Sequence, residues 1–361
     1  MINQERLVQT FLDLVAIDSP SGEEELICKE LIRRFEAIGG ECEADAIHNL
    51  IARFDGTRAG EWLMLSAHMD TAGQDRGIKP QIRDGVIYSD GTTILGGDDK
   101  SGVAAILEVI ESIKEDGAAH PPIEAIISVS EEMGLKGASE MDKGRIRSRR
   151  GYVLDAGGPS GVIVTSAPSQ DSIEVKVRGR TAHAGAEPEK GINAIKVASE
   201  AIAAMPLGRI DEETTANIGV IQGGVATNIV PDHVFIKGEA RSRDDAKLAR
   251  QTVAMAAAFQ DAADRNGARV EFKLKRRYTT YKLADDHPVV RAAADAIRRL
   301  GWTPIIKASG GGTDANIYAE HGIYCAIIST GMAEVHTPNE HIAIEDMTNA
   351  AKLLQDIVLA A

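Results

Sequence analysis

The chain has 361 residues, which is longer than one hydrophobic core usually serves, so two domains are the first expectation. The hydrophobic fraction of 43% and the charged fraction of 26% are typical of a globular protein, and no apolar run is long enough to cross a bilayer. A formal charge of -14 disfavours a nucleic-acid partner, which would require a basic face. The three cysteines are widely spaced and the first residues lack a signal-peptide pattern, so we expect a cytoplasmic protein without a sulfur-ligated metal.

The first part of the chain alternates between helical and strand-like segments. Apolar residues at helical spacing predict helices over residues 4–17, 23–38 and 100–113. Short apolar runs predict strands over residues 50–54, 62–66, 123–129 and 152–154, and the second run is nearly continuous, as buried strands are. This order predicts an α/β domain, in which a mixed sheet is flanked by helices.

The pattern changes near residue 170. Residues 172–178 alternate strictly between apolar and polar side chains, and they are followed by a helix (191–204), two strands (215–222 and 233–241), a helix (244–266) and a strand (269–274). This order is that of a ferredoxin-like α+β unit. The α/β pattern returns after residue 284, so we expect a main domain of residues 1–169 and 285–361, interrupted by an inserted domain of residues 170–284.

Histidine and carboxylate residues recur where the predicted strands of the main domain end. His68 and Asp70 follow the strand 62–66, and the carboxyl ends of strands are where α/β proteins place their sites. His68 could ligate a metal while Asp70 orients its imidazole, although a local hydrogen bond would also explain a histidine at a strand end. In Gly-Gly-Asp98-Asp99-Lys, a helix N-cap explains one aspartate, whereas a bridging metal ligand explains the pair.

Three later segments extend this pattern. Glu131 and Glu132 end the strand 123–129, so that one could ligate a metal and the other act as a general base, or both could be exposed loop residues. Asp155 follows the apolar run 152–154 and alone would be a turn aspartate. In Val335-His-Thr-Pro-Asn-Glu-His341 either histidine could be a ligand. Together these nitrogen and oxygen donors suit zinc, and also manganese or cobalt.

The motifs, in this order, resemble the superfamily of co-catalytic dinuclear zinc peptidases that contains peptidase T, carboxypeptidase G, succinyl-diaminopimelate desuccinylase and aminoacylase. The resemblance covers nearly the whole chain and implies two Zn²⁺ ions, with Co²⁺ or Mn²⁺ as substitutes. It implies that Asp70 supports a ligand, that Glu131 is the general base, and that a cis peptide bond joins Asp98 to Asp99. The implied metal ligands are His68, Asp98, Glu132, Asp155 and His336.

The inserted domain also resembles the lid and dimerisation domain of this superfamily, through the segment Arg180-Thr-Ala-His183-Ala-Gly. The resemblance implies that His183 contacts the substrate carbonyl and stabilises the oxyanion, and that the lid forms a homodimer. It also implies that Asn228 and Arg241 contact substrate, and that Gly311 and Gly312 belong to a glycine-rich substrate loop, where glycine would let the backbone approach a ligand. A turn histidine of purely structural role is the alternative for His183.

The segments Glu-Glu-Met-Gly-Leu-Lys-Gly-Ala and Gly-Gly-Thr-Asp-Ala resemble peptidase T and also the glutamyl and deblocking aminopeptidases, which carry a different lid. The segment around His183 favours peptidase T, so we expect a peptidase T-like aminopeptidase that acts on short peptides such as tripeptides. One alternative is an N-acyl-amino-acid deacylase or a carboxypeptidase of the same superfamily. The other is a metal-binding or assembly protein without activity. Neither a nucleic acid nor a membrane is an expected partner.

Overall fold

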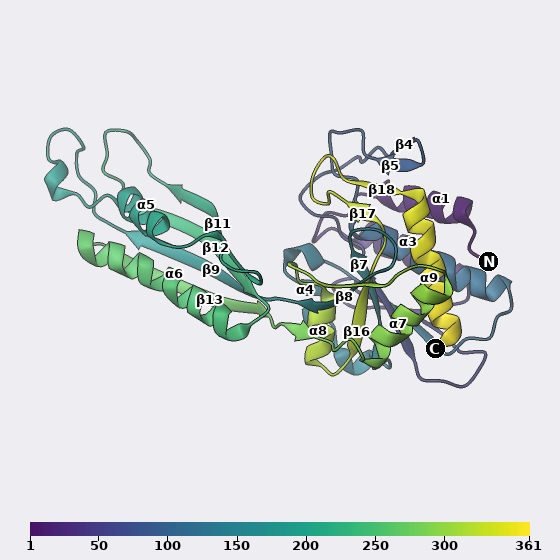
Figure 1. The fold of residues 1–361 in the computed structure, drawn as a ribbon. Helices are drawn as coiled ribbons and strands as arrows, with labels where there is room; N and C mark the ends of the chain where they lie inside the picture. Colours follow the sequence, from purple (N-terminus) through teal and green to yellow (C-terminus); the bar gives the residue numbers. More distant parts are fainter. The chain divides into compact units, whose positions relative to one another are not determined.

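The computed structural model describes residues 1–361 as two compact units. The first unit comprises Met1–Ser166, Lys282–Ser309 and Thr313–Ala361, and the second comprises Ala167–Tyr281 together with Gly310–Gly312. The second unit is therefore inserted into the sequence of the first (Figure 1). None of the helices combines the length and the apolar composition that crossing a membrane requires.

A nine-stranded mixed sheet forms the centre of the first unit, in the order β1-β2-β6-β3-β7-β16-β8-β14, with β15 paired to β8. Its strands are β1 (Glu41–Ala44), β2 (Leu50–Phe54), β3 (Leu63–His68), β6 (Ile123–Ser128), β7 (Arg150–Ala156), β8 (Val162–Ala167), β14 (Tyr281–Lys282), β15 (Ile305–Ala308) and β16 (Tyr324–Ser329). Strand β3 pairs in parallel with both β6 and β7. The carboxyl ends of these three strands therefore meet at one edge of the sheet.

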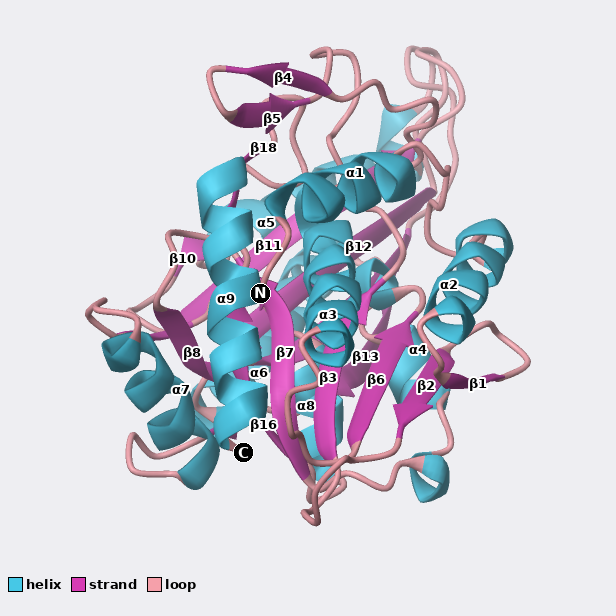
Figure 2. Cartoon of the chain, turned by 90° about the vertical axis from the view of Figure 1, so that its right-hand side faces the viewer, coloured by secondary structure: helices cyan, strands magenta, loops and turns pink.

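Seven α-helices belong to the first unit, some packed on this sheet and others, such as the first, packed on neighbouring helices. They are α1 (Gln4–Val15), α2 (Glu25–Ala37), α3 (Gly97–Glu115), α4 (Lys136–Glu140), α7 (Pro288–Arg299), α8 (Asp314–Glu320) and α9 (Ile344–Ala360). In α1, for example, Leu7, Phe11 and Leu14 are buried at helical spacing, and the Asn3 side chain accepts the N–H of Arg6 to cap the first turn. Figure 2 shows α3 and α9 in front of the central strands, with α1 above them and α8 behind the sheet. This arrangement confirms the predicted α/β class.

A second, four-stranded sheet of the first unit was not predicted from the sequence. It has the order β17-β18-β5-β4 and consists of β4 (Gln81–Arg83), β5 (Val86–Tyr88), β17 (Met332–Ala333) and β18 (His341–Ala343). Strands this short show no apolar periodicity, so their pairing is set by contacts between distant segments. The pairing of β18 with β5 anchors the chain on one side of His336.

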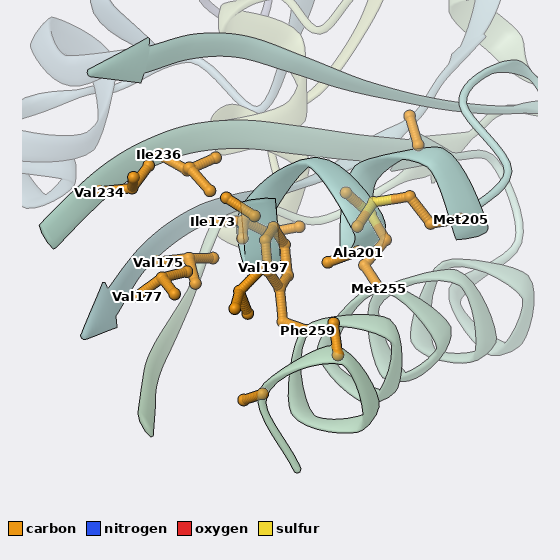
Figure 3. Close-up of a cluster of buried hydrophobic side chains, with 14 of the residues drawn as sticks. Ile173, Val175, Val177, Val197, Ala201, Met205, Val234, Ile236, Met255 and Phe259 are labelled. Atoms are coloured by element: carbon orange, nitrogen blue, oxygen red, sulfur yellow. The ribbon is translucent and has the colours of Figure 1, made fainter. Parts of the chain in front are cut away.

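The second unit is a five-stranded antiparallel sheet with two helices. Its elements are β9 (Ser169–Arg178), α5 (Ala194–Ala204), β10 (Gly208–Arg209), β11 (Thr214–Gly223), β12 (His233–Ser242), α6 (Asp245–Asn266) and β13 (Arg269–Tyr278), and the sheet order is β10-β11-β12-β9-β13. Figure 3 shows Ile173, Val175 and Val177 of β9 gathered with Val197 of α5 and Phe259 of α6 in one buried cluster. Apart from the short β10, order and topology are those of the predicted ferredoxin-like unit.

Candidate metal centre

Three parallel strands deliver most of the predicted ligands to one edge of the main sheet. His68 is the last residue of β3, and Asp155 lies one residue before the end of β7. Glu131 and Glu132 lie in a short helical turn, Glu131–Met133, which follows β6. Because β3 lies between β6 and β7, His68 occupies the middle of this edge.

The loop before α3 brings Asp98 to His68. The bond between Asp98 and Asp99 is cis, as the resemblance implied. The Asp99 side chain is fully buried and accepts the N–H groups of His68 (3.2 Å) and Gly102 (3.3 Å), so that it caps the start of the regular helix. The Asp98 carboxylate instead lies 3.1 Å from Nε2 of His68. The two adjacent aspartates thus have different surroundings, and Asp98 is the one that faces the strand ends.

The segment between β17 and β18 adds His336, whose backbone has a positive φ of 63°. Its Nε2 lies 2.7 Å from the Glu132 carboxylate and 3.2 Å from that of Asp98. The other candidate histidine, His341, stacks on Tyr88 and its Nδ1 contacts the carbonyl of Asn339. His336 is therefore the histidine of this segment that joins the cluster.

These side chains form two sets of donor atoms that share one carboxylate. His68, Asp98 and Asp155 make up one set, and Asp98, Glu132 and His336 make up the other, with all donor atoms of a set within 4.8 Å of one another. A further group joins His68 to Glu131 and Glu132. Two three-residue sets with a common aspartate are the arrangement in which one carboxylate can bridge two metal ions.

Asp70 holds the ligand side chains from behind. It is completely buried, and one of its oxygens lies 3.2 Å from Nδ1 of His68. The same carboxylate accepts the N–H groups of Glu131 (3.0 Å) and Glu132 (3.3 Å) and the hydroxyl of Ser21 (2.6 Å). Asp70 thus orients the imidazole and also positions the turn that carries both glutamates.

The charge balance of the cluster fits a divalent cation. Burial, together with the carboxylates of Asp98 and Asp99, raises the pKa of Asp155 well above its usual range. Hydrogen bonds to Asp98 and Glu132 raise the pKa of His336 to about 10. Burial opposes the protonation of His68, but its bonds to Asp70 and Asp98 prevail and raise its pKa as well. Buried carboxylates that retain protons, beside histidines that attract them, mark a site short of positive charge, and metal ions would supply that charge.

Glu131 shares a raised pKa with Asp155 but differs from Asp155 in its place relative to the two donor sets. Burial is the largest cause that raises its pKa well above the usual range, followed by the nearby charge of Asp155. Its side chain belongs to neither of the two sets that share Asp98. A buried carboxyl group that lies beside both donor sets and belongs to neither is placed to act as a general base.

The remaining predicted residues lie in the second unit. His183 is exposed, and its Nδ1 accepts the N–H groups of Gly185 (3.1 Å) and Ala186 (3.0 Å), which fixes the ring and its tautomer. Asn228 is close to it, since its carbonyl accepts the N–H of Ala184 (3.0 Å). The guanidinium of Arg241 donates to Glu239 at 2.9 and 3.1 Å. Their roles in substrate binding stay predictions.

In the glycine-rich loop, packing explains why one position, Gly312, is a glycine. A Cβ atom at Gly312 would overlap the ring of Tyr278, so a larger residue would force the ring or the loop to shift. The loop residues Gly310–Gly312 belong to the second unit, whereas the predicted boundaries assigned them to the main domain. The predicted contact of Gly311 and Gly312 with substrate is a separate matter and stays a prediction.

Sequence reasoning missed several side chains that build the site from behind. Glu340 is buried and accepts three N–H groups of the loop that carries Asp98. Glu24 accepts both the N–H and the hydroxyl of Ser130, next to Glu131. Asp314 accepts the hydroxyl of Ser128, and burial raises its pKa to about 6. The only sequence signal for Glu340 and Asp314 is their position inside motifs: Glu340 lies in the segment from Val335 to His341, and Asp314 lies in Gly-Gly-Thr-Asp-Ala.

Comparison with known proteins identifies the class that this fold and site define. Residues 64–360 match the family model described as peptidase family M20/M25/M40, and the chain belongs to this family. It is a metallopeptidase and resembles peptidase T, as the sequence predicted.

Individual relatives match over the full length. The chain is 43% identical to the uncharacterized protein YqjE of Bacillus subtilis, over 99% of both chains. It is 45% identical to the aminopeptidase PepT of Bacillus cereus, with a TM-score of 0.88 and all of both chains covered. A tripeptidase from Staphylococcus aureus is 40% identical, with a TM-score of 0.94 over 100% of this chain and 99% of that one.

Proposed function

We propose that this protein is an aminopeptidase that hydrolyses tripeptides and other short peptides at a centre of two divalent metal ions. The observation that carries the proposal is the pair of donor sets that share Asp98. The other members of these sets lie at the ends of β3 and β7, in the turn after β6, and in the segment of His336. Under this proposal His68 and Asp155 hold one ion, Glu132 and His336 hold the other, and Asp98 holds both.

Metal ions held there would polarise the scissile carbonyl and lower the pKa of the attacking water. We assign Glu131, which lies beside both donor sets and belongs to neither, as the base that takes the proton of that water and delivers it to the leaving amine. Asp70 keeps the Glu131 turn in place through the N–H bond at 3.0 Å. The Nε2 atom of His183 is the group we assign to the developing oxyanion, because its Nδ1 is already used as an acceptor within the turn.

Zinc is the metal we propose, since imidazole and carboxylate donors without sulfur suit Zn²⁺, with Co²⁺ or Mn²⁺ as working substitutes. The aminopeptidase activity is supported by the names of the two solved relatives, an aminopeptidase and a tripeptidase at 45% and 40% identity. Arg241, held by Glu239, would bind a substrate carboxylate, with Asn228 and the loop of Gly311 and Gly312 as further contacts.

The test is a substrate panel on metal-stripped protein reloaded with Zn²⁺, Co²⁺ or Mn²⁺. We expect release of the N-terminal residue from tripeptides, with little cleavage of N-acetyl or N-succinyl amino acids. Glu131→Gln is the matched variant, because it keeps the shape of the side chain and removes the base. It should bind metal like the wild type and lose a factor of about 10²–10⁴ in kcat. Cleavage of blocked amino acids alone would favour the deacylase, and full activity of Glu131→Gln would refute the base.

We also propose a cytoplasmic homodimer that forms through the second unit. The support is the outer edge of β11, where β10 pairs only with Thr215 and Ala216. Beyond that point Val220 and Ile221 are 38% and 50% exposed. An unpaired, apolar strand edge is a natural site for strand addition by a second copy.

A further inference from the structure

The side chain of Glu340 is buried beside the metal centre but is not one of its candidate ligands. Its relative exposure is 1%, and its carboxylate accepts three backbone N–H groups. One oxygen accepts those of Leu95 (2.8 Å) and Gly96 (2.9 Å), and the other accepts that of Asp98 (3.0 Å). A carboxylate that accepts three backbone bonds fixes the course of the loop that it binds.

The loop is shaped to receive this carboxylate. Gly96 has a φ of 76°, in the left-handed region that favours glycine. A Cβ atom at Gly97 would lie 3.1 Å from Oε1 of Glu340, closer than an ordinary contact. Glycine is thus favoured at the two positions before Asp98 for different reasons. At Gly96 the backbone turn requires a positive φ, and at Gly97 the carboxylate of Glu340 approaches closely.

Glu340 belongs to the same short segment as His336, between β17 and β18. Glu340 follows His336 in the same segment, and its N–H donates to the carbonyl of Thr337 (3.0 Å), which closes a tight turn. The Thr337 hydroxyl donates to the carbonyl of Glu334 (2.7 Å), and β18 begins directly after Glu340. The backbone that carries His336 is therefore joined, through one buried side chain, to the backbone that carries Asp98.

We propose that Glu340 is a positioning residue that clamps the Asp98 loop to the His336 segment and so sets the spacing of two ligands of one metal ion. This inference rests on the proposed function, in which Asp98 and His336 hold the same ion. Removing the carboxylate leaves three buried N–H groups without their acceptor, and the loop must shift to satisfy them. Residues that orient metal ligands typically contribute about 10–100-fold in metal affinity.

The test is Glu340→Gln, assayed with Co²⁺ as the probe. The amide keeps the size of the side chain, but its NH₂ group turns a donor toward backbone N–H groups that need an acceptor. We expect Co²⁺ affinity to fall about 10–100-fold and the visible absorption bands of bound Co²⁺ to shift. At limiting metal, kcat for a tripeptide should fall while KM stays nearly constant, and added metal should restore part of kcat.

Glu124→Gln is the matched control. Glu124 is also completely buried and accepts the N–H groups of Arg147 (3.1 Å) and Ser148 (3.0 Å). It also accepts the Ser148 hydroxyl (2.8 Å) and pairs with Arg53 (3.1 Å), and it lies near the start of β6, at the end away from the metal centre. This variant should lose thermal stability and keep the Co²⁺ affinity and spectrum of the wild type. Gly97→Ala is a second variant that retains the Glu340 carboxylate and crowds it, and a weaker loss of Co²⁺ affinity is expected there.

The outcomes separate this inference from the function on which it rests. If the wild type binds Co²⁺ and cleaves tripeptides while Glu340→Gln and Gly97→Ala keep its affinity and spectrum, the positioning role is wrong and Glu340 only stabilises the fold. If Glu340→Gln does not fold, an unchanged Co²⁺ affinity in Gly97→Ala overturns the role by itself. If the wild type neither binds Co²⁺ nor cleaves peptides, the proposed function fails first.

Discussion

At the scale of single residues, Asp70 shows how one buried carboxylate can serve several segments. It contacts Nδ1 of His68 on one side and the N–H groups of Glu131 and Glu132 on the other, while Ser21 donates to it from the N-terminal part of the chain. A ligand and the proposed general base therefore depend on the same side chain. An error in its geometry would disturb metal binding and proton transfer together.

Asp70→Asn should consequently impair both. The amide can accept through one oxygen only, so it cannot accept from both glutamate N–H groups and keep its contact with the imidazole. We expect metal affinity to fall about 10–100-fold, with a lower kcat even at saturating metal. Competition with a chelator and steady-state kinetics would measure the two effects. Unchanged values for both would show that Asp70 does not support the centre.

The sequence allowed much of this site to be predicted, because His68, Glu131, Glu132 and Asp155 all lie at or just beyond strand ends, where local patterns are informative. The residue pattern alone left Asp98 and Asp99 indistinguishable, since the loop geometry that separates a helix cap from a ligand has no local signal, and only the family resemblance assigned the ligand to Asp98. Glu340 was not predicted, because its contact with the N–H of Asp98 spans 242 residues and pairs a side chain with backbone. Such contacts become visible only in the folded chain.

At the scale of elements, long amphipathic segments were predictable and short ones were not. The alternation of β9 and the length of α6 follow directly from apolar spacing. The small sheet of β4, β5, β17 and β18 has strands of two or three residues, for which periodicity carries no information. The turn that precedes β11 contains Asp211, and the hydrogen bonds of this aspartate lead to a prediction about pH.

Asp211 accepts the N–H groups of Glu213 (2.9 Å) and Thr214 (2.8 Å) and lies 3.4 Å from the ammonium group of Lys247. The bond from Glu213 is the largest cause that lowers the pKa of Asp211 from 3.8 to about 2. A lowered pKa in the folded state means that its stabilising effect is present above pH 3.8 and is lost as the pH falls through about 2.

Asp211→Asn should therefore melt at a lower temperature than the wild type at pH 7, and the difference should shrink as the pH falls from 3.8 toward 2. The effect is small, because the side chain is 37% exposed and solvent screens its charge. Melting curves of both proteins across this pH range would measure it. A difference that grew in acid would contradict the sign of the pKa shift.

At the scale of the whole molecule, the open edge of β11 predicts an assembly that can be tested by mass. Light scattering should give twice the 38.5 kDa of one chain. Ile221→Lys places a charge on the exposed edge and should yield monomers. Leu274→Lys is the matched control, since Leu274 is 51% exposed on β13 at the opposite edge of the same sheet. If Leu274→Lys yielded monomers and Ile221→Lys did not, the dimer interface would not be at β11.

The order of strands in the main sheet bears on how the chain is completed during synthesis. Strands β7 and β8 are neighbours in the sequence, yet β16 lies between them in the sheet and is made only after the whole inserted unit. The inserted unit, nearly all of it one continuous segment, can fold while it leaves the ribosome. The main unit must wait with a gap between β7 and β8 until residues 324–329 arrive. A nascent chain cut short before β16 would thus carry a finished second unit on an unfinished first unit, and it would also lack His336, one of the proposed metal ligands.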